Sequence, residues 1–66
     1  MAPNRALKLA IVAAGLKQKD VARRARIDLW RLSRIVHRDV EARPDERARL
    51  ARVLKTPVDE LFEVTQ

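Results

Sequence analysis

Residues 15–38 read GLKQKDVARRARIDLWRLSRIVHR and contain the strongest structural signal of the chain. Leu16 and Val21 have the spacing of a hydrophobic staple, in which the residue before a helix N-cap packs against the first turn of that helix. Ile27 and Leu32 repeat this spacing, and Asp28 between them is a preferred N-cap residue. The pattern therefore predicts a short helix at about residues 18–25, a turn at about residues 26–28 and a second helix at about residues 29–37.

A further helix is indicated before this segment. Leu7, Ala10, Ile11 and Ala14 recur at the spacing of one helix face. Gly15 follows them, and glycine is the usual residue where a helix ends in the left-handed conformation. We therefore expect the first helix to cover about residues 4–14.

Two more helices are indicated after it. A proline followed by two acidic residues is typical of a first helical turn, and it predicts a helix over about residues 44–54. Thr56 is the expected N-cap of a fifth helix, with Pro57 as its first residue and Leu61 and Phe62 as its buried pair. No segment shows the alternation of a strand, so the predicted fold class is all-α, with five helices.

The length of 66 residues limits the chain to one small domain over residues 1–66. The absence of cysteine excludes disulfides and thiolate metal sites, and it is compatible with a reducing, cytoplasmic location. One histidine, one serine and no tyrosine leave no nucleophile and base to pair, and a single glycine gives no phosphate-binding loop. We therefore expect a protein that is not an enzyme, with no cofactor and no metal.

Charge is divided unevenly along the chain. Residues 1–38 hold ten basic and two acidic residues, whereas residues 39–66 hold five basic and seven acidic ones. A positive half suits a polyanion, nucleic acid before an anionic membrane, although a merely solvated surface would have the same composition. Membrane binding is the least favoured of these three interpretations, because the apolar faces of the helices are needed for the core that they form with each other.

Two short helices joined by a tight turn form a helix-turn-helix unit, here about residues 18–37, whose second helix can lie in the major groove of DNA. The segment 15–38 and the later stretch RLARVLKTPVDELF resemble the Cro/repressor-type (XRE family) DNA-binding domains over nearly the whole chain. The resemblance implies the lambda-repressor-like architecture. Two residues depart from the family pattern, Lys17 in place of a capping Ser or Thr and Arg26 in place of the turn glycine. Asp20 alone must then cap the first helix of the unit, and a left-handed Arg26 would cost about 1 kcal/mol.

The resemblance also implies which residues contact DNA. The base-reading positions correspond to Leu29, Trp30, Arg31 and Arg34. An arginine can form a bidentate contact with guanine, and Leu29 or Trp30 an apolar contact with a thymine methyl group. For Trp30 the alternative is packing against the loop before the fourth helix or against a partner.

The resemblance also implies phosphate contacts around the start of the first helix of the unit, where the helix dipole favours an anion. The candidates are Lys17, Gln18, Lys19, Arg38 and Arg43. For Lys19 the alternative is an ordinary solvated helix face. Asp39 and Glu41 would repel phosphate from the loop, so few contacts are expected there.

The function expected from this resemblance is a stand-alone, sequence-specific transcriptional regulator, similar to the small Cro-like members, that binds double-stranded DNA as a homodimer. By analogy with the family, the dimer interface would include Phe62 and Val64. The alternative is a protein-interaction or antitoxin-type module that uses Leu29 and Trp30 as a partner surface, because an exposed apolar pair on a basic helix suits either function.

Overall fold

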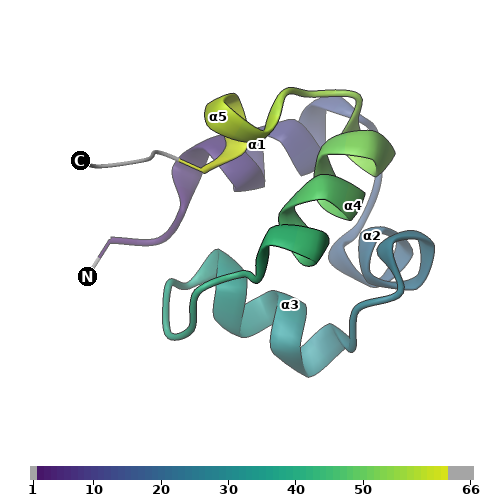
Figure 1. The fold of residues 1–66 in the computed structure, drawn as a ribbon. Helices are drawn as coiled ribbons and strands as arrows, with labels where there is room; N and C mark the ends of the chain where they lie inside the picture. The colour runs from purple at the N-terminus through teal and green to yellow at the C-terminus, as the bar shows by residue number, and fades with distance from the viewer. Residues whose placement is uncertain (1, 63–66) are drawn as a thin grey trace.

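The computed structural model describes residues 2–62, which form five helices and no strand (Figure 1). The helices are α1 (Arg5–Ala13), α2 (Gln18–Ala25), α3 (Leu29–Val36), α4 (Pro44–Leu54) and α5 (Val58–Leu61). The all-α, five-helix prediction is confirmed, and the predicted bounds of the first four helices agree to within about one residue at each end. In the view of Figure 1, α3 lies at the bottom of the molecule and α5 at the top.

The predicted helix ends are present at three places. The Oδ2 atom of Asp28 accepts hydrogen bonds from the backbone N–H groups of Trp30 and Arg31, at 3.0 and 3.4 Å. Asp20 accepts the backbone N–H of Lys17 at 3.2 Å, and it is the only acceptor in this cap because an ammonium group cannot accept. Gly15 has a φ of 71°, in the left-handed region that favours glycine.

The start of α5 differs from the prediction. Pro57, not Thr56, is the N-cap residue, and the Thr56 hydroxyl instead donates to the carbonyl oxygen of Leu54 at 3.0 Å. Leu61 is buried as expected, whereas Phe62 is only half-buried and already has an extended backbone. The preceding helix ends in a left-handed residue, Lys55, so the chain leaves α4 in a tight turn, and the Thr56 side chain satisfies the carbonyl of Leu54 there.

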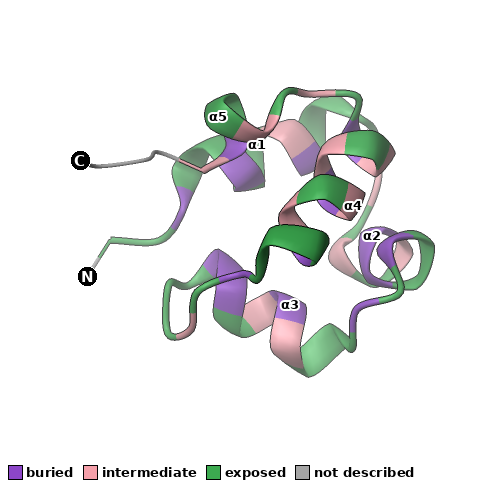
Figure 2. Ribbon diagram, in the orientation of Figure 1, coloured by how far each residue is buried: buried purple, intermediate pink, exposed green. Residues whose placement is uncertain are grey.

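The core lies where all five helices face each other, and two loop residues complete it (Figure 2). The buried apolar side chains are Leu7, Ile11, Val21, Ala22, Ala25, Ile27, Leu32, Ile35, Val36, Ala42, Leu50, Leu54 and Leu61. Ala14 was expected on the inner face of α1, but it is exposed because the helix ends at Ala13 and Ala14 is the C-cap. Leu9 and Val12 on the outer face of α1 are exposed as well.

Asn4 is one of two polar residues buried in this core, and it joins three helices. Its Oδ1 atom caps α1 by accepting the backbone N–H of Leu7 at 3.0 Å. Its Nδ2 group donates to the carbonyl oxygen of Leu61 in α5 at 2.9 Å. Its backbone N–H donates to the carbonyl oxygen of Val36 in α3 at 2.7 Å. Burial of a polar group costs little folding free energy when the group keeps its hydrogen-bond partners, and it costs much more when the group is left unpaired.

Candidate nucleic-acid interface

The turn between α2 and α3 sets the angle at which the second helix leaves the first. Arg26 has φ 57° and ψ 44°, so the turn keeps the left-handed conformation although the residue is not glycine. The next residue, Ile27, is buried and donates its backbone N–H to the carbonyl oxygen of Ala22 at 2.9 Å. The burial of the Ile27 side chain and its backbone hydrogen bond to Ala22 anchor the turn to α2. Asp28 starts α3 directly after the turn.

The outer face of α3 is apolar in its first turn and basic in its second. Leu29 is 47% exposed and Trp30 79% exposed, whereas Leu32 and Ile35 on the opposite face are buried. Figure 2 shows this first turn as an exposed end of the molecule, and Arg34 is exposed one turn further along. Trp30 therefore does not pack against the loop before α4, and one alternative that the sequence left open is excluded.

Arg31 faces a different partner from its neighbours on α3. Its Nε donates to Oε2 of Glu46 in α4 at 2.6 Å, and its Nη2 donates to Oε1 at 2.8 Å. The Nη2 group also lies 3.4 Å from the carbonyl oxygen of Glu41. The Nε–Nη2 edge of the guanidinium, one of the edges that can bind guanine in a bidentate manner, is thus directed at a carboxylate of the same chain.

Glu46 is almost completely enclosed, with only 2% of its side chain exposed. Besides the two bonds from Arg31, its Oε1 accepts the backbone N–H of Arg43 at 2.8 Å. The hydrogen bonds from Arg31 lower the pKa of Glu46 to about 2, and the Arg43 N–H acts in the same direction, against the effect of burial. The carboxylate is therefore ionised at neutral pH and holds α3 to the start of α4.

The predicted phosphate contacts lie in two places. Lys17 and Lys19 are exposed at the start of α2, and Gln18 between them is half-buried. The first backbone N–H groups of a helix have no acceptor within the helix, so this helix start presents N–H donors together with two ammonium groups. A cap of this kind suits a phosphate.

The other candidates lie at the ends of the α3–α4 loop. Arg38 has a φ of 63° and is exposed just after α3. Arg43 is exposed before α4, where its Nε lies 3.5 Å from Oδ1 of Asp45. Asp39 and Glu41 are exposed between them, as the sequence suggested, so the loop carries both signs of charge.

One of the two predicted dimer residues, Phe62, lies within the described part of the chain. The half-buried Phe62 packs against the core, and the guanidinium of Arg47 lies 5.6 Å from the centre of its ring. Val64 lies outside the described residues.

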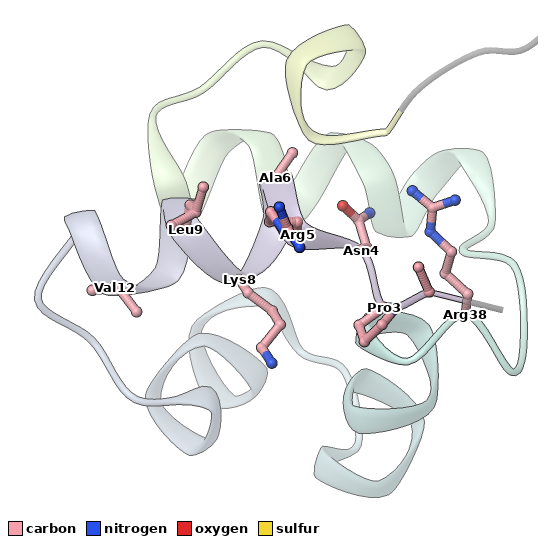
Figure 3. A pocket seen from close by; sticks show the side chains of 9 residues that line it. Pro3, Asn4, Arg5, Ala6, Lys8, Leu9, Val12 and Arg38 are labelled. Carbon is pink, nitrogen blue, oxygen red and sulfur yellow. The ribbon is translucent and has the colours of Figure 1, made fainter.

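A second exposed apolar surface lies on α1 and was not predicted. Leu9 and Val12 line a pocket along this helix, together with the basic residues Arg5, Lys8 and Arg38 (Figure 3). The sequence pattern placed both apolar residues outside the buried stripe of α1, but nothing in it indicated that they would share a pocket. Glu46 was expected only as a favourable charge at the start of α4, and no signal in the sequence linked it to Arg31.

These features define the class of protein. Two short helices meet at a turn anchored by the buried Ile27, and the second helix presents its outer face to solvent. The start of the first helix carries basic residues and open N–H groups, as in helix-turn-helix DNA-binding domains. A family model described as Helix-turn-helix matches residues 7–61, and the chain belongs to this family, whose members are of the XRE type. The comparison with curated proteins gave no match, and neither did the comparison with solved structures.

Membership of this family makes the domain a DNA-binding one of the kind found in XRE-type transcription regulators, a family of regulatory domains rather than of enzymes. Within residues 2–62 no three His, Asp or Glu side chains are grouped in a way that could hold a metal ion. None of the described helices has the length and apolar character needed to cross a membrane.

Proposed function

We propose that the protein is a sequence-specific transcriptional regulator that binds an operator as a homodimer. The observation that carries the proposal is the exposed outer face of α3, directly after the turn that the buried Ile27 anchors. One helix-turn-helix unit reads only a few base pairs, whereas two units on half-sites about 34 Å apart roughly double the specific contacts.

The proposed base-reading residues are Leu29, Trp30 and Arg34, with a lesser part for Arg31. Two of the nitrogen atoms of Arg31 already donate to Glu46, which leaves Nη1 as the group that can turn toward a base. Arg34 is exposed on the same helix and is the better candidate for a bidentate contact with guanine.

The proposed phosphate contacts are Lys17, Gln18 and Lys19 at the start of α2, with Arg38 and Arg43 at the ends of the loop. Arg43 is the weakest of these, because Asp45 and Glu46 lie near its guanidinium. Phe62 and Val64 remain the proposed dimer contacts, by analogy with the family.

The test is selection from a pool of random-sequence duplexes at two salt concentrations, followed by sequencing of the bound DNA. A sequence-specific dimer should enrich an inverted repeat with half-sites about one helical turn apart. Binding that depends on salt but enriches no sequence would contradict the proposal, because phosphate contacts alone produce such binding. Sedimentation of the free and bound protein would establish whether two chains occupy each site.

A second candidate function has one observation in its favour. The 79% exposure of Trp30 places a large aromatic side chain in solvent, and aromatic residues of this kind are frequent anchors of protein interfaces. In the interaction-module alternative, Trp30→Ala should abolish partner or self-association while nonspecific DNA binding is kept. In the regulator proposal the same change lowers affinity for the selected site. Val12→Ala is a suitable control, because it truncates a similarly exposed apolar side chain, 73% exposed, on α1.

A further inference from the structure

We infer that the first turn of α3 distinguishes base pairs by contact with the C5-methyl group of thymine, and that this contact is the main determinant of its sequence preference. The inference rests on the proposed function, and it names the chemical group that the helix recognises. It follows from three features of α3, which are its amino-acid content, the engagement of Arg31 and the exposure of the first turn.

The amino-acid content of α3 excludes the usual contact with adenine. The helix reads LWRLSRIV and contains neither asparagine nor glutamine, the residues that bind the N6 and N7 atoms of adenine in a bidentate manner. Ser33 is half-buried, and the indole of Trp30 offers one N–H, which cannot form a bidentate bond. Hydrogen-bond reading by α3 therefore depends on its two arginines.

One of these arginines is occupied within the domain. The bonds of 2.6 and 2.8 Å from Arg31 to Glu46 direct the Nε–Nη2 edge away from the outer face of α3. The enclosed position of Glu46 means that releasing Arg31 would leave a buried carboxylate without its main partner, which is costly. Arg31 is thus a positioning residue that fixes the orientation of α3 relative to α4, and it contributes little to reading bases.

The remaining surface of the first turn is apolar. Leu29 and Trp30 are adjacent and both exposed. They lie at the N-terminal end of α3, and in helix-turn-helix units the N-terminal residues of the second helix contact base edges. The thymine C5-methyl is the one apolar group among the base-edge features of the major groove. An apolar side chain buries most apolar surface there by covering this methyl, so Leu29 and Trp30 favour half-sites with thymine at the positions they face.

The experiment uses the sequence enriched by the selection described above. Each thymine of one half-site is replaced by uracil in turn, which removes the methyl and keeps the Watson–Crick hydrogen bonds. Dissociation constants are measured at one fixed salt concentration by fluorescence anisotropy. Burial of one methyl corresponds to about a fourfold change in affinity, so at least one uracil should weaken binding by about three- to fivefold. Uracil outside the contacted base pairs serves as the control.

A variant separates direct contact from an effect on DNA shape. In Trp30→Ala or Leu29→Ala the uracil penalty at the contacted position should disappear, whereas in Val12→Ala it should persist at full size. Circular dichroism of each variant establishes that the helices are retained. A penalty that is equal in all variants would assign the effect to the DNA and overturn the inference.

Other outcomes have equally definite meanings. An enriched site whose thymines can all be replaced by uracil without loss of affinity overturns the inference and leaves the proposed function intact, as does an enriched site without thymine in its half-sites. Failure to enrich any sequence overturns the proposed function and the inference together. The two failures are therefore distinguishable in one series of measurements.

Discussion

Replacement of Glu46 by glutamine tests the energetic role of the link between α3 and α4. The change keeps the size of the side chain but removes its negative charge, and it places an amide N–H₂ group where an oxygen accepts from Arg31. The backbone N–H of Arg43 also depends on Oε1 of this carboxylate, at 2.8 Å. The variant therefore disturbs three hydrogen bonds at one enclosed position.

The magnitude follows from the pKa of Glu46. Its fall from the ordinary value of 4.5 to about 2 corresponds to about 3 kcal/mol of preference for the ionised form in the folded protein. The Arg31 side chain is 35% exposed, so solvent screens part of the interaction and about 2 kcal/mol is the realistic figure. For a domain of this size, such a loss lowers the melting temperature by roughly 10 °C.

The assay is thermal unfolding followed by circular dichroism at pH 7, with Asp45→Asn as the matched control. Asp45 lies in the same helical turn and forms ion pairs with Arg43 and Arg49, but its side chain is 54% exposed, so its loss should cost less than about 1 kcal/mol. Equal melting temperatures for Glu46→Gln and Asp45→Asn would refute the reasoning.

The same comparison made against pH adds a second check. A carboxyl group whose pKa is lowered by folding stabilises the protein fully above its unfolded pKa, and this contribution is lost as the pH falls toward the folded pKa. The advantage of the parent protein over Glu46→Gln should therefore be constant above about pH 4.5 and shrink between that value and about pH 2. A gap in melting temperature that is unchanged at pH 2.5 would contradict the assignment.

Three further predictions follow from other parts of the molecule. Lys17→Ala should weaken binding to all DNA sequences alike and reduce the slope of log affinity against log salt by about one, and an unchanged slope would remove Lys17 from the phosphate contacts. Arg26→Gly should raise the free energy of unfolding in urea by about 0.5–1 kcal/mol, because the left-handed backbone at φ 57° suits glycine; a lower midpoint would contradict this. Asn4→Ala should lower the free energy of unfolding by about 2–3 kcal/mol, because the cap at Leu7 and the bond to Leu61 are lost together and buried groups are left unpaired. A loss below about 0.5 kcal/mol would show that water replaces the Asn4 side chain.

Local signals predicted most of the fold. The staple of Ile27 and Leu32, the cap at Asp28 and the glycine at position 15 act within a few residues of the chain, and a sequence shows such short-range chemistry directly. The start of α5 was misplaced by one residue because the Thr56 hydroxyl bonds to Leu54 in the turn after α4 and does not cap α5, which depends on the folded turn.

Long-range contacts could not be predicted in the same way. Arg31 and Glu46 are fifteen residues apart, and their pairing depends on how α3 crosses α4, which no periodicity encodes. For that reason the sequence grouped Arg31 with the base-reading residues, whereas the structure shows it bonded inside the domain. The exposure of Trp30 likewise required the packed structure, because a lone tryptophan in a small domain is equally compatible with the core.

The position of Asn4 bears on how the domain opens. One side chain near the beginning of the chain is bonded to the carbonyl oxygen of Leu61 near the end of the described part, and the adjacent backbone N–H is bonded to Val36 at the end of α3. Release of the first turn of α1 and release of α5 both break the hydrogen bond from Asn4 to Leu61, so the two helices are coupled through this residue. Amide hydrogen exchange should accordingly show the N–H groups of Asn4 and Leu7 exchanging together, at a rate close to that of global unfolding instead of the faster rate usual for chain ends.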